Sequence, residues 1–286
     1  MAVRRAAPAK LNLYLHVTGR RPDGYHLLDS LVAFADIGDE LVAEPAPALS
    51  LAVEGSFAAA LADENPASNL VWRAATALAE RAGRPPAVAL TLRKSLPVAS
   101  GIGGGSSDAA ATLSALAELW SLDLAAPRFA GLATALGADV PVCLMGRTAW
   151  LGGIGEELAP APALPAAWVV LANPGVAVAT PAVFKARRGP FSAPARFESR
   201  PADAAALARL LAARRNDLTD AAIGIAPEIA EVLEALGSRA GALITRMCGS
   251  GATCYALFAE EAAARVTAAA LGKAQPRWWV AAARLL

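Results

Sequence analysis

The chain has 286 residues, which is enough for about two domains that each bury a core of their own. Hydrophobic residues make up 56% of the sequence and charged residues only 18%, so the composition excludes an intrinsically disordered chain. The net charge is +1 and the sequence contains no basic run, which argues against a nucleic acid as partner. We therefore expect a globular protein that does not bind a long polyanion.

The best candidate for a membrane segment is the stretch 158–184, which has 27 residues and no charged side chain. It contains five prolines and an Asn-Pro-Gly turn at 173–175, so no continuous helix could satisfy its backbone in lipid. Near the N-terminus, Lys10 and Asn12 interrupt the apolar region that a signal peptide requires. We therefore expect a cytoplasmic protein with no membrane partner.

Cysteine and histidine are too sparse for a disulfide framework or a zinc site. The three cysteines form no C-x-x-C pair, and His16 and His26 are the only histidines. We expect Cys143, Cys248 and Cys254 to be small buried hydrophobes.

The first predicted element is a strand at residues 10–16, where leucines alternate with polar residues. The period of two places Lys10 and Asn12 on one face of this strand. Further strands are expected near 27–34 and 40–43, so the chain begins with a β-rich region.

Residues 69–120 indicate a helix, a strand, a glycine-rich loop and a second helix. Asn69 can cap a helix that ends near Arg81, and residues 87–92 form a short apolar strand. Four glycines within residues 101–105 then lead into a helix over 109–120. Such a loop lets backbone N–H groups approach an anion at the positive end of the helix dipole. Because the spacing is neither a Walker A loop nor G-x-G-x-x-G, a phosphate site and a flexible loop with a capping serine both remain open.

The rest of the chain predicts alternating strands and helices, which is typical of an α+β fold. The proline-rich stretch 160–165 is the best linker candidate, so we expect an N-terminal domain at 1–159 and a C-terminal domain at 160–286. The expected helices lie at 128–136, 203–213, 228–236 and 260–271, and the expected strands at 168–172, 253–258 and 277–282, with glycine-rich turns at 152–155 and after 243–247.

Two further residues are candidates for chemistry, each with a simpler alternative. Lys10 is one of only four lysines among 26 basic residues, so a lysine on this alternating strand could be a cation that faces a site rather than a solvated surface charge. Asp139 lies between Gly137 and Pro141, where it could act as a general base or simply as a turn residue.

Five segments, in this order, resemble the GHMP kinase superfamily, which includes galactokinase and the homoserine, mevalonate and phosphomevalonate kinases. The segments are 8–13, 21–26, 96–108, 137–141 and 249–252, and together they span nearly the whole chain. The run from Pro22 to His26 is most similar to members that act on a cytidyl diphospho-sugar alcohol. The resemblance favours the functional interpretation of both Lys10 and Asp139.

The resemblance implies a two-domain α+β fold. The N-terminal domain would be like domain 2 of ribosomal protein S5, and the C-terminal domain would be ferredoxin-like and would close the substrate cleft. It also implies transfer of the γ-phosphoryl group of ATP, with Mg²⁺, to the 2-hydroxyl of 4-diphosphocytidyl-2-C-methyl-D-erythritol, an intermediate of non-mevalonate isoprenoid synthesis.

The residue roles follow from the same resemblance. Asp139 would take the proton of the acceptor hydroxyl, and Lys10 would polarise that hydroxyl. The residues expected to bind ATP are Asn69, Lys94, Pro97, Gly101, Gly103, Gly104, Gly105, Ser106 and Ser107. Those expected to bind the cytidyl substrate are Asn12, Tyr25, His26, Thr180 and Phe184, with the cytosine stacked between Tyr25 and Phe184 and its edge contacted by His26.

The sequence departs from the family pattern at a few positions. Ala99 and Ser100 stand where relatives often carry a glycine, and Thr219 stands where an acidic residue is expected. Ser106 or Ser107 would approach Mg²⁺, but no carboxylate is assigned as its ligand.

Two other functions compete with this one. A GHMP kinase for another small alcohol, such as homoserine or mevalonate, would keep the phosphate loop but would have no reason to keep Tyr25 and His26. A non-catalytic nucleotide- or RNA-binding protein on the same fold would need neither Lys10 nor Asp139 and should carry a basic stripe, which the net charge of +1 does not supply.

Overall fold

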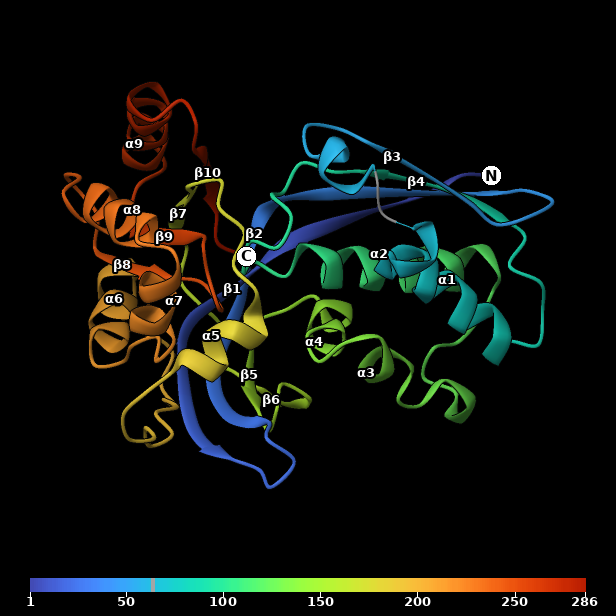
Figure 1. Cartoon of the computed structure of the whole chain (residues 1–286), viewed down its shortest axis with the longest axis horizontal. Helices are drawn as coiled ribbons and strands as arrows, with labels where there is room; N and C mark the ends of the chain where they lie inside the picture. Colours follow the sequence, from blue (N-terminus) through green and yellow to red (C-terminus); the bar gives the residue numbers. More distant parts are fainter. Residues whose placement is uncertain (63–64) are drawn as a thin grey trace. The chain divides into compact units, whose positions relative to one another are not determined.

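The computed structural model describes residues 1–62 and 65–286, and the chain divides into two compact units (Figure 1). Unit 1 consists of residues 1–9, 38–98 and 103–146, and unit 2 of residues 10–37, 99–102 and 147–286. Neither unit is a continuous piece of chain, because two long strands contribute to both. The expected domain boundary after residue 159 therefore differs from the division by contacts, and it stays a prediction.

The two long strands are β1 (Val3–Arg20) and β2 (His26–Pro45), which pair with each other. The strand predicted at 10–16 is the middle of β1, and the strands predicted at 27–34 and 40–43 are parts of the single strand β2. Nearly every residue from Ala7 to Val17 is buried, so the polar residues of β1 lie in the interior as well as the leucines. Buried polar side chains require hydrogen-bond partners, and these partners define the site described below.

In unit 1, β4 (Val88–Arg93) pairs antiparallel with residues 40–45 of β2 and parallel with β3 (Ser50–Glu54). Two helices, α1 (Leu70–Arg81) and α2 (Gly104–Leu119), pack against each other (Figure 1). The remaining elements are α3 (Leu132–Leu136), α4 (Val140–Met145) and the 3-10 helices η1 (Ala58–Leu61), η2 (Pro66–Ser68) and η3 (Pro127–Phe129).

Three helix predictions in unit 1 have different outcomes. The cap at Asn69 is confirmed, since its Oδ1 accepts a hydrogen bond of 2.9 Å from Val71 N. The helix expected from 109 begins at Gly104, because Gly103 takes a left-handed conformation (φ 66°) that starts the helix without a side-chain cap. The helix expected over 128–136 is wrong, since Gly131 (φ 71°) separates η3 from α3.

In unit 2, four antiparallel strands form a sheet in the order β10-β7-β9-β8. They are β7 (Trp168–Asn173), β8 (Ile244–Met247), β9 (Cys254–Phe258) and β10 (Trp279–Arg284). Helices α5 (Thr180–Ala186), α6 (Ala204–Ala212), α7 (Thr219–Ile225) and α8 (Glu228–Gly237) lie between β7 and β8 in the chain, and α9 (Glu261–Ala274) lies between β9 and β10. This β-α-β-β-α-β order is the ferredoxin-like arrangement, so the predicted α+β fold is confirmed.

The core of unit 2 combines the two ends of the sequence. Helices α8 and α9 pack on the sheet through Ile229, Val232 and Leu271, and Leu15 and Val17 of β1 join the same buried cluster. Two short strands, β5 (Ala149–Gly152) and β6 (Glu157–Pro160), pair with each other, and β5 also pairs with residues 30–32 of β2.

The uncharged stretch 158–184 is divided among β6, β7 and α5. Among the residues that the structure describes, no helix has the length and apolarity needed to cross a membrane.

Candidate active site

The N-terminus of α2 in unit 1 offers a set of backbone donors. Ser107 N donates 2.9 Å to Gly103 O, and no side chain caps the helix at Gly103. The N–H groups of the first helical residues, 104–106, have no carbonyl partner within the helix. An anion placed there would be bound by these donors and by the positive end of a 16-residue helix.

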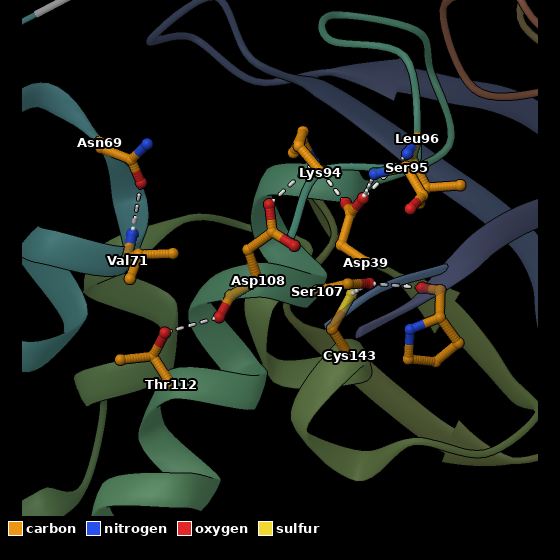
Figure 2. Close-up of polar contacts among 11 residues, drawn as sticks. Asp39, Asn69, Val71, Lys94, Ser95, Leu96, Ser107, Asp108, Thr112 and Cys143 are labelled. Atoms are coloured by element: carbon orange, nitrogen blue, oxygen red, sulfur yellow. Dashed lines mark hydrogen bonds and ion pairs between the residues drawn. The ribbon is translucent and has the colours of Figure 1, made fainter. Parts of the chain in front are cut away.

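A buried ion cluster adjoins the first turn of this helix (Figure 2). Lys94 Nζ donates to Asp108 Oδ2 at 2.9 Å and also to Asp39 Oδ2, and none of these three side chains is more than 4% exposed. Asp39 Oδ1 accepts hydrogen bonds from Ser95 N (2.6 Å) and Leu96 N (2.8 Å). The cluster therefore ties α2 to β2 and to the segment that follows β4.

The cluster holds two carboxyl groups for one ammonium group, and this arrangement shifts the pKa values of Asp108 and Lys94. Burial raises the pKa of Asp108 to about 7, with the Lys94 charge lowering it and the Asp39 charge raising it further. Burial would lower the pKa of Lys94, but the two carboxylates outweigh burial and raise it overall. The second oxygen of Asp108, Oδ1, is buried without a hydrogen-bond partner, which fits a carboxyl that is easily protonated.

The same cluster explains the glycine at 104. A Cβ atom at this position would lie 3.1 Å from Lys94 Nζ and 3.7 Å from Asp39 Oδ2. Because both carboxyl groups hold the ammonium in place, a side chain here would displace the helix start. We expected Lys94 to contact ATP. The structure shows Lys94 bound by Asp39 and Asp108 next to Gly104, and its contact with the nucleotide stays a prediction.

Ser107, next to Asp108 in α2, contacts the chain start and the helix that follows Asp139. Ser107 Oγ donates 2.7 Å to Pro8 O and lies 3.4 Å from Cys143 Sγ in α4 (Figure 2). Asp139 is the half-buried residue that precedes α4, and its carboxylate does not cap that helix. The sequence analysis expected Asp139 outside a helix but did not predict α4, whose 6 residues carry less than two helical turns. Pro97, also expected to bind ATP, is buried.

In unit 2, Lys10 begins a chain of buried hydrogen bonds. Its ammonium group, on a residue only 3% exposed, donates 3.0 Å to Asn12 Oδ1, and Asn12 Nδ2 donates 2.8 Å to Ser30 Oγ. The backbone N–H of Lys10 donates 2.9 Å to the carbonyl oxygen of Ile102, which lies within the glycine-rich loop between Gly101 and Gly103. Two predicted residues, Lys10 and Asn12, are therefore brought together, whereas Ser30 was not predicted.

The Gly-Ser-Gly-Ala segment 249–252 supports the first half of the phosphate loop. A Cβ atom on Gly101 would lie 2.5 Å from Gly251 O, and one on Gly249 would lie 2.6 Å from Gly101 O, so the two backbones pack without side chains between them. Asn216 Nδ2 donates 2.8 Å to Gly249 O and to Met247 O. Thr180, at the start of α5, is 2.7 Å from Ser250 by their hydroxyl oxygens.

The residues expected to hold a cytosine are partly assembled. The rings of His26 and Phe184 stack with a centroid distance of 5.1 Å and an interplanar angle of 24°. Tyr25, which precedes His26 in the chain, is 60% exposed. Burial, followed by the charges of Arg20 and Arg187, lowers the pKa of His26, so its imidazole is neutral near pH 7 and keeps one acceptor nitrogen.

Two departures from the family pattern have a structural counterpart. Ala99 has a φ of 51°, in the left-handed region that favours the glycine found in relatives. Thr219 begins α7, and Asp220 supplies the negative charge in the first turn of that helix.

The residues present do not form a metal centre. Among residues 1–62 and 65–286, no three His, Cys, Asp or Glu side chains are grouped to hold a metal ion. Ser106 or Ser107 was expected near Mg²⁺; the Ser107 hydroxyl donates its proton to Pro8 O, which leaves its oxygen lone pairs available, and the approach to Mg²⁺ stays a prediction. The three cysteines are buried, as predicted.

Two family models match the chain. The model described as GHMP kinases N terminal domain matches residues 69–147, and the model described as GHMP kinases C terminal matches residues 197–276.

Individual proteins are similar over nearly the whole length. A 4-diphosphocytidyl-2-C-methyl-D-erythritol kinase of Paramagnetospirillum magneticum is 55% identical over 280 residues, which cover 98% of this chain and 97% of the relative. One of Cereibacter sphaeroides is 57% identical over 282 residues, with 98% of both chains covered.

Solved structures of GHMP kinases are similar to this chain over nearly its whole length. A crystal structure of 4-(cytidine 5'-diphospho)-2C-methyl-D-erythritol kinase is 38% identical, has a TM-score of 0.79 and covers 99% of this chain and 98% of its own. The homoserine kinase of Cytophaga hutchinsonii, at 17% identity and a TM-score of 0.71, covers 99% of this chain and 94% of its own and shares the fold.

Proposed function

Because this chain belongs to the GHMP kinase family, we propose that it transfers the γ-phosphoryl group of ATP to the 2-hydroxyl of 4-diphosphocytidyl-2-C-methyl-D-erythritol. The observation that carries the substrate is the identity of 50–57% to relatives that bear this enzyme's name, over nearly the full length. The neighbouring His26 and Phe184 rings support the same substrate, since a small alcohol such as homoserine or mevalonate has no base for an aromatic ring to stack on.

The reaction forms one bond to phosphorus and breaks another. The acceptor oxygen attacks the γ-phosphorus, the bond to the bridging β,γ-oxygen breaks, and ADP leaves with that oxygen. In our proposal the Asp139 carboxylate takes the hydroxyl proton, and the Lys10 ammonium stabilises the negative charge that develops on the acceptor oxygen.

ATP would be bound chiefly through backbone groups of the glycine loop. The N–H groups of residues 104–106 suit the phosphates, and the Lys94 cluster holds the helix start rigidly in place. Asn69 at the cap of α1 is proposed to lie near the adenosine. Mg²⁺ would enter with the phosphates of ATP, and no step is assigned to it, because the described residues supply no ligand set of their own.

The remaining predicted residues would bind the acceptor. Tyr25 and Phe184 would enclose the cytosine, and the neutral His26 would accept or donate a hydrogen bond at its edge. Asn12 and Thr180 are proposed to contact the substrate from β1 and α5.

The proposal is tested by measuring ADP release with MgATP and a panel of alcohols. We expect turnover on 4-diphosphocytidyl-2-C-methyl-D-erythritol and little on homoserine, mevalonate or galactose. Turnover on one of those three alcohols, with none on the cytidyl compound, would refute the substrate assignment while leaving the kinase family intact.

A further inference from the structure

Ser30, a fully buried residue of β2, is bonded on both sides within unit 2. Its hydroxyl donates 2.5 Å to Tyr14 O in β1, and the same oxygen accepts the 2.8 Å hydrogen bond from Asn12 Nδ2. The strand around it is fixed as well, because the Tyr14 hydroxyl donates 2.7 Å to Asp29 Oδ2, next to Ser30 in the chain.

These contacts allow only one direction for the hydrogen bonds. The Tyr14 carbonyl can only accept, so the single proton of Ser30 points to it, and Ser30 offers Asn12 lone pairs alone. The amide of Asn12 must then turn its NH₂ group toward Ser30. Its carbonyl oxygen consequently faces Lys10, whose ammonium group can only donate.

We propose that Ser30 is a positioning residue for the phosphoryl transfer, because it fixes the Asn12 amide and through it the ammonium group of Lys10. This inference rests on the proposed role of Lys10. Ser30 itself contacts neither substrate, and its contribution is to keep the acceptor end of Asn12 aimed at the lysine.

Removal of the hydroxyl has a defined consequence. In Ser30→Ala the Asn12 NH₂ group loses its acceptor, and the amide is free to rotate by 180°. Rotation would set NH₂ against the ammonium group and displace it. Because a misplacement of about 1 Å can cost about 100-fold in rate, we expect Ser30→Ala to lower kcat by about 10-fold or more.

The test compares steady-state kinetics, with MgATP and the cytidyl substrate, for Ser30→Ala and a matched control. Tyr255→Phe also removes a buried hydroxyl that donates to a β1 carbonyl, that of Leu13 at 2.7 Å, but it does not touch Asn12. We expect kcat to fall in Ser30→Ala with the KM for ATP within about twofold, and Tyr255→Phe to keep its kcat. Ser30→Cys keeps a side chain of the same shape with a larger terminal atom and weakens both hydrogen bonds, so it provides the same test if Ser30→Ala does not fold.

A double-substitution cycle shows whether Ser30 acts through Asn12. In an Asn12→Ala background, the further change Ser30→Ala should lower kcat by less than about twofold. An equal loss in both backgrounds, a wild-type kcat in Ser30→Ala and Ser30→Cys, or an equal loss in Tyr255→Phe would each overturn the inference.

Lys10→Met separates the two proposals. If this variant loses activity while Ser30→Ala keeps it, only the positioning role fails. If Lys10→Met retains the wild-type kcat, the role of Lys10 fails and the inference fails with it.

Discussion

Two of the four lysines in this chain are buried, and each is held by side-chain oxygens. Lys94 is placed between the carboxyl groups of Asp39 and Asp108, whereas Lys10 is held by the neutral amide oxygen of Asn12. An ammonium group enclosed by two carboxyl groups is well suited to support structure, since these groups fix its position and balance its charge.

Asp139→Asn tests the proposed general base. The amide has the shape of the carboxylate but cannot take the proton, so we expect kcat to fall by about 10²- to 10⁴-fold with both KM values little changed. Steady-state kinetics and a melting curve measured on the same preparation provide the comparison. A wild-type kcat in a folded variant would contradict the role.

Asp108→Asn tests the buried cluster through pH. The pKa of Asp108 is about 7 in the folded protein and near its ordinary value of 3.8 when unfolded, so between these values the folded state keeps a proton that the unfolded state has released. The wild type therefore loses stability as the pH rises through this window, and the loss is complete above about 7. Asparagine does not titrate, so the Tm of Asp108→Asn relative to wild type should rise from pH 4 to 7 and then level off.

Thermal melts of both proteins at several pH values measure this difference. Asp220→Asn, at an exposed carboxyl in α7, is the matched control. Parallel pH profiles for wild type and Asp108→Asn would show that Asp108 is not held protonated by its surroundings.

At the level of the elements, Phe184 in α5 contacts both the core of unit 2 and the ring of His26. The ring is half-buried against the core of unit 2 and stacks on His26, so its removal would affect both stability and binding. Tyr25 is the cleaner probe of the cytosine site, because it lies in an exposed turn.

We therefore expect Tyr25→Ala to weaken binding of the cytidyl substrate by about 5- to 150-fold, as loss of one stacking ring does. The KM for ATP and the Tm should stay near their wild-type values. Isothermal titration with the cytidyl substrate, and a melting curve, measure the two effects separately. Unchanged affinity would remove Tyr25 from the substrate site.

Local patterns in the sequence predicted the elements that are long and regular. The helix capped by Asn69, three of the four strands of the C-terminal sheet and the helix after the glycine loop all follow from caps and periodicity. The strands β3, β5, β6 and β8 and the helices α4, α5 and α7 were missed, since segments of four to seven residues carry too few periods.

The site could be predicted only in part, for the same physical reason. The loop and Lys10 stand out locally by their glycines and by the scarcity of lysine. The partners of Lys94 do not, because Asp39 is 55 residues away in sequence and is brought near only by strand pairing. Ser30 was missed likewise, since its role depends on the pairing of β1 with β2.

At the scale of the whole molecule, the strands β1 and β2 are shared by both units. The interior of unit 2 contains Leu15 and Val17 from the start of the chain together with Leu271 from α9. In the same unit, the last residue of the chain is bound to β2 by a hydrogen bond of 2.8 Å from Leu286 N to Phe34 O.

This arrangement determines when the protein can fold during its synthesis. A ribosome adds about 5–20 residues per second, so the interval between Val17 and Leu271 lasts on the order of tens of seconds. During that time the apolar side chains at the start of the nascent polypeptide have no partners from α8 and α9 to cover them. Until those helices have left the exit tunnel, Leu15 and Val17 are open to chaperones, so the early strands, although made first, are among the last parts of unit 2 to be sealed from water.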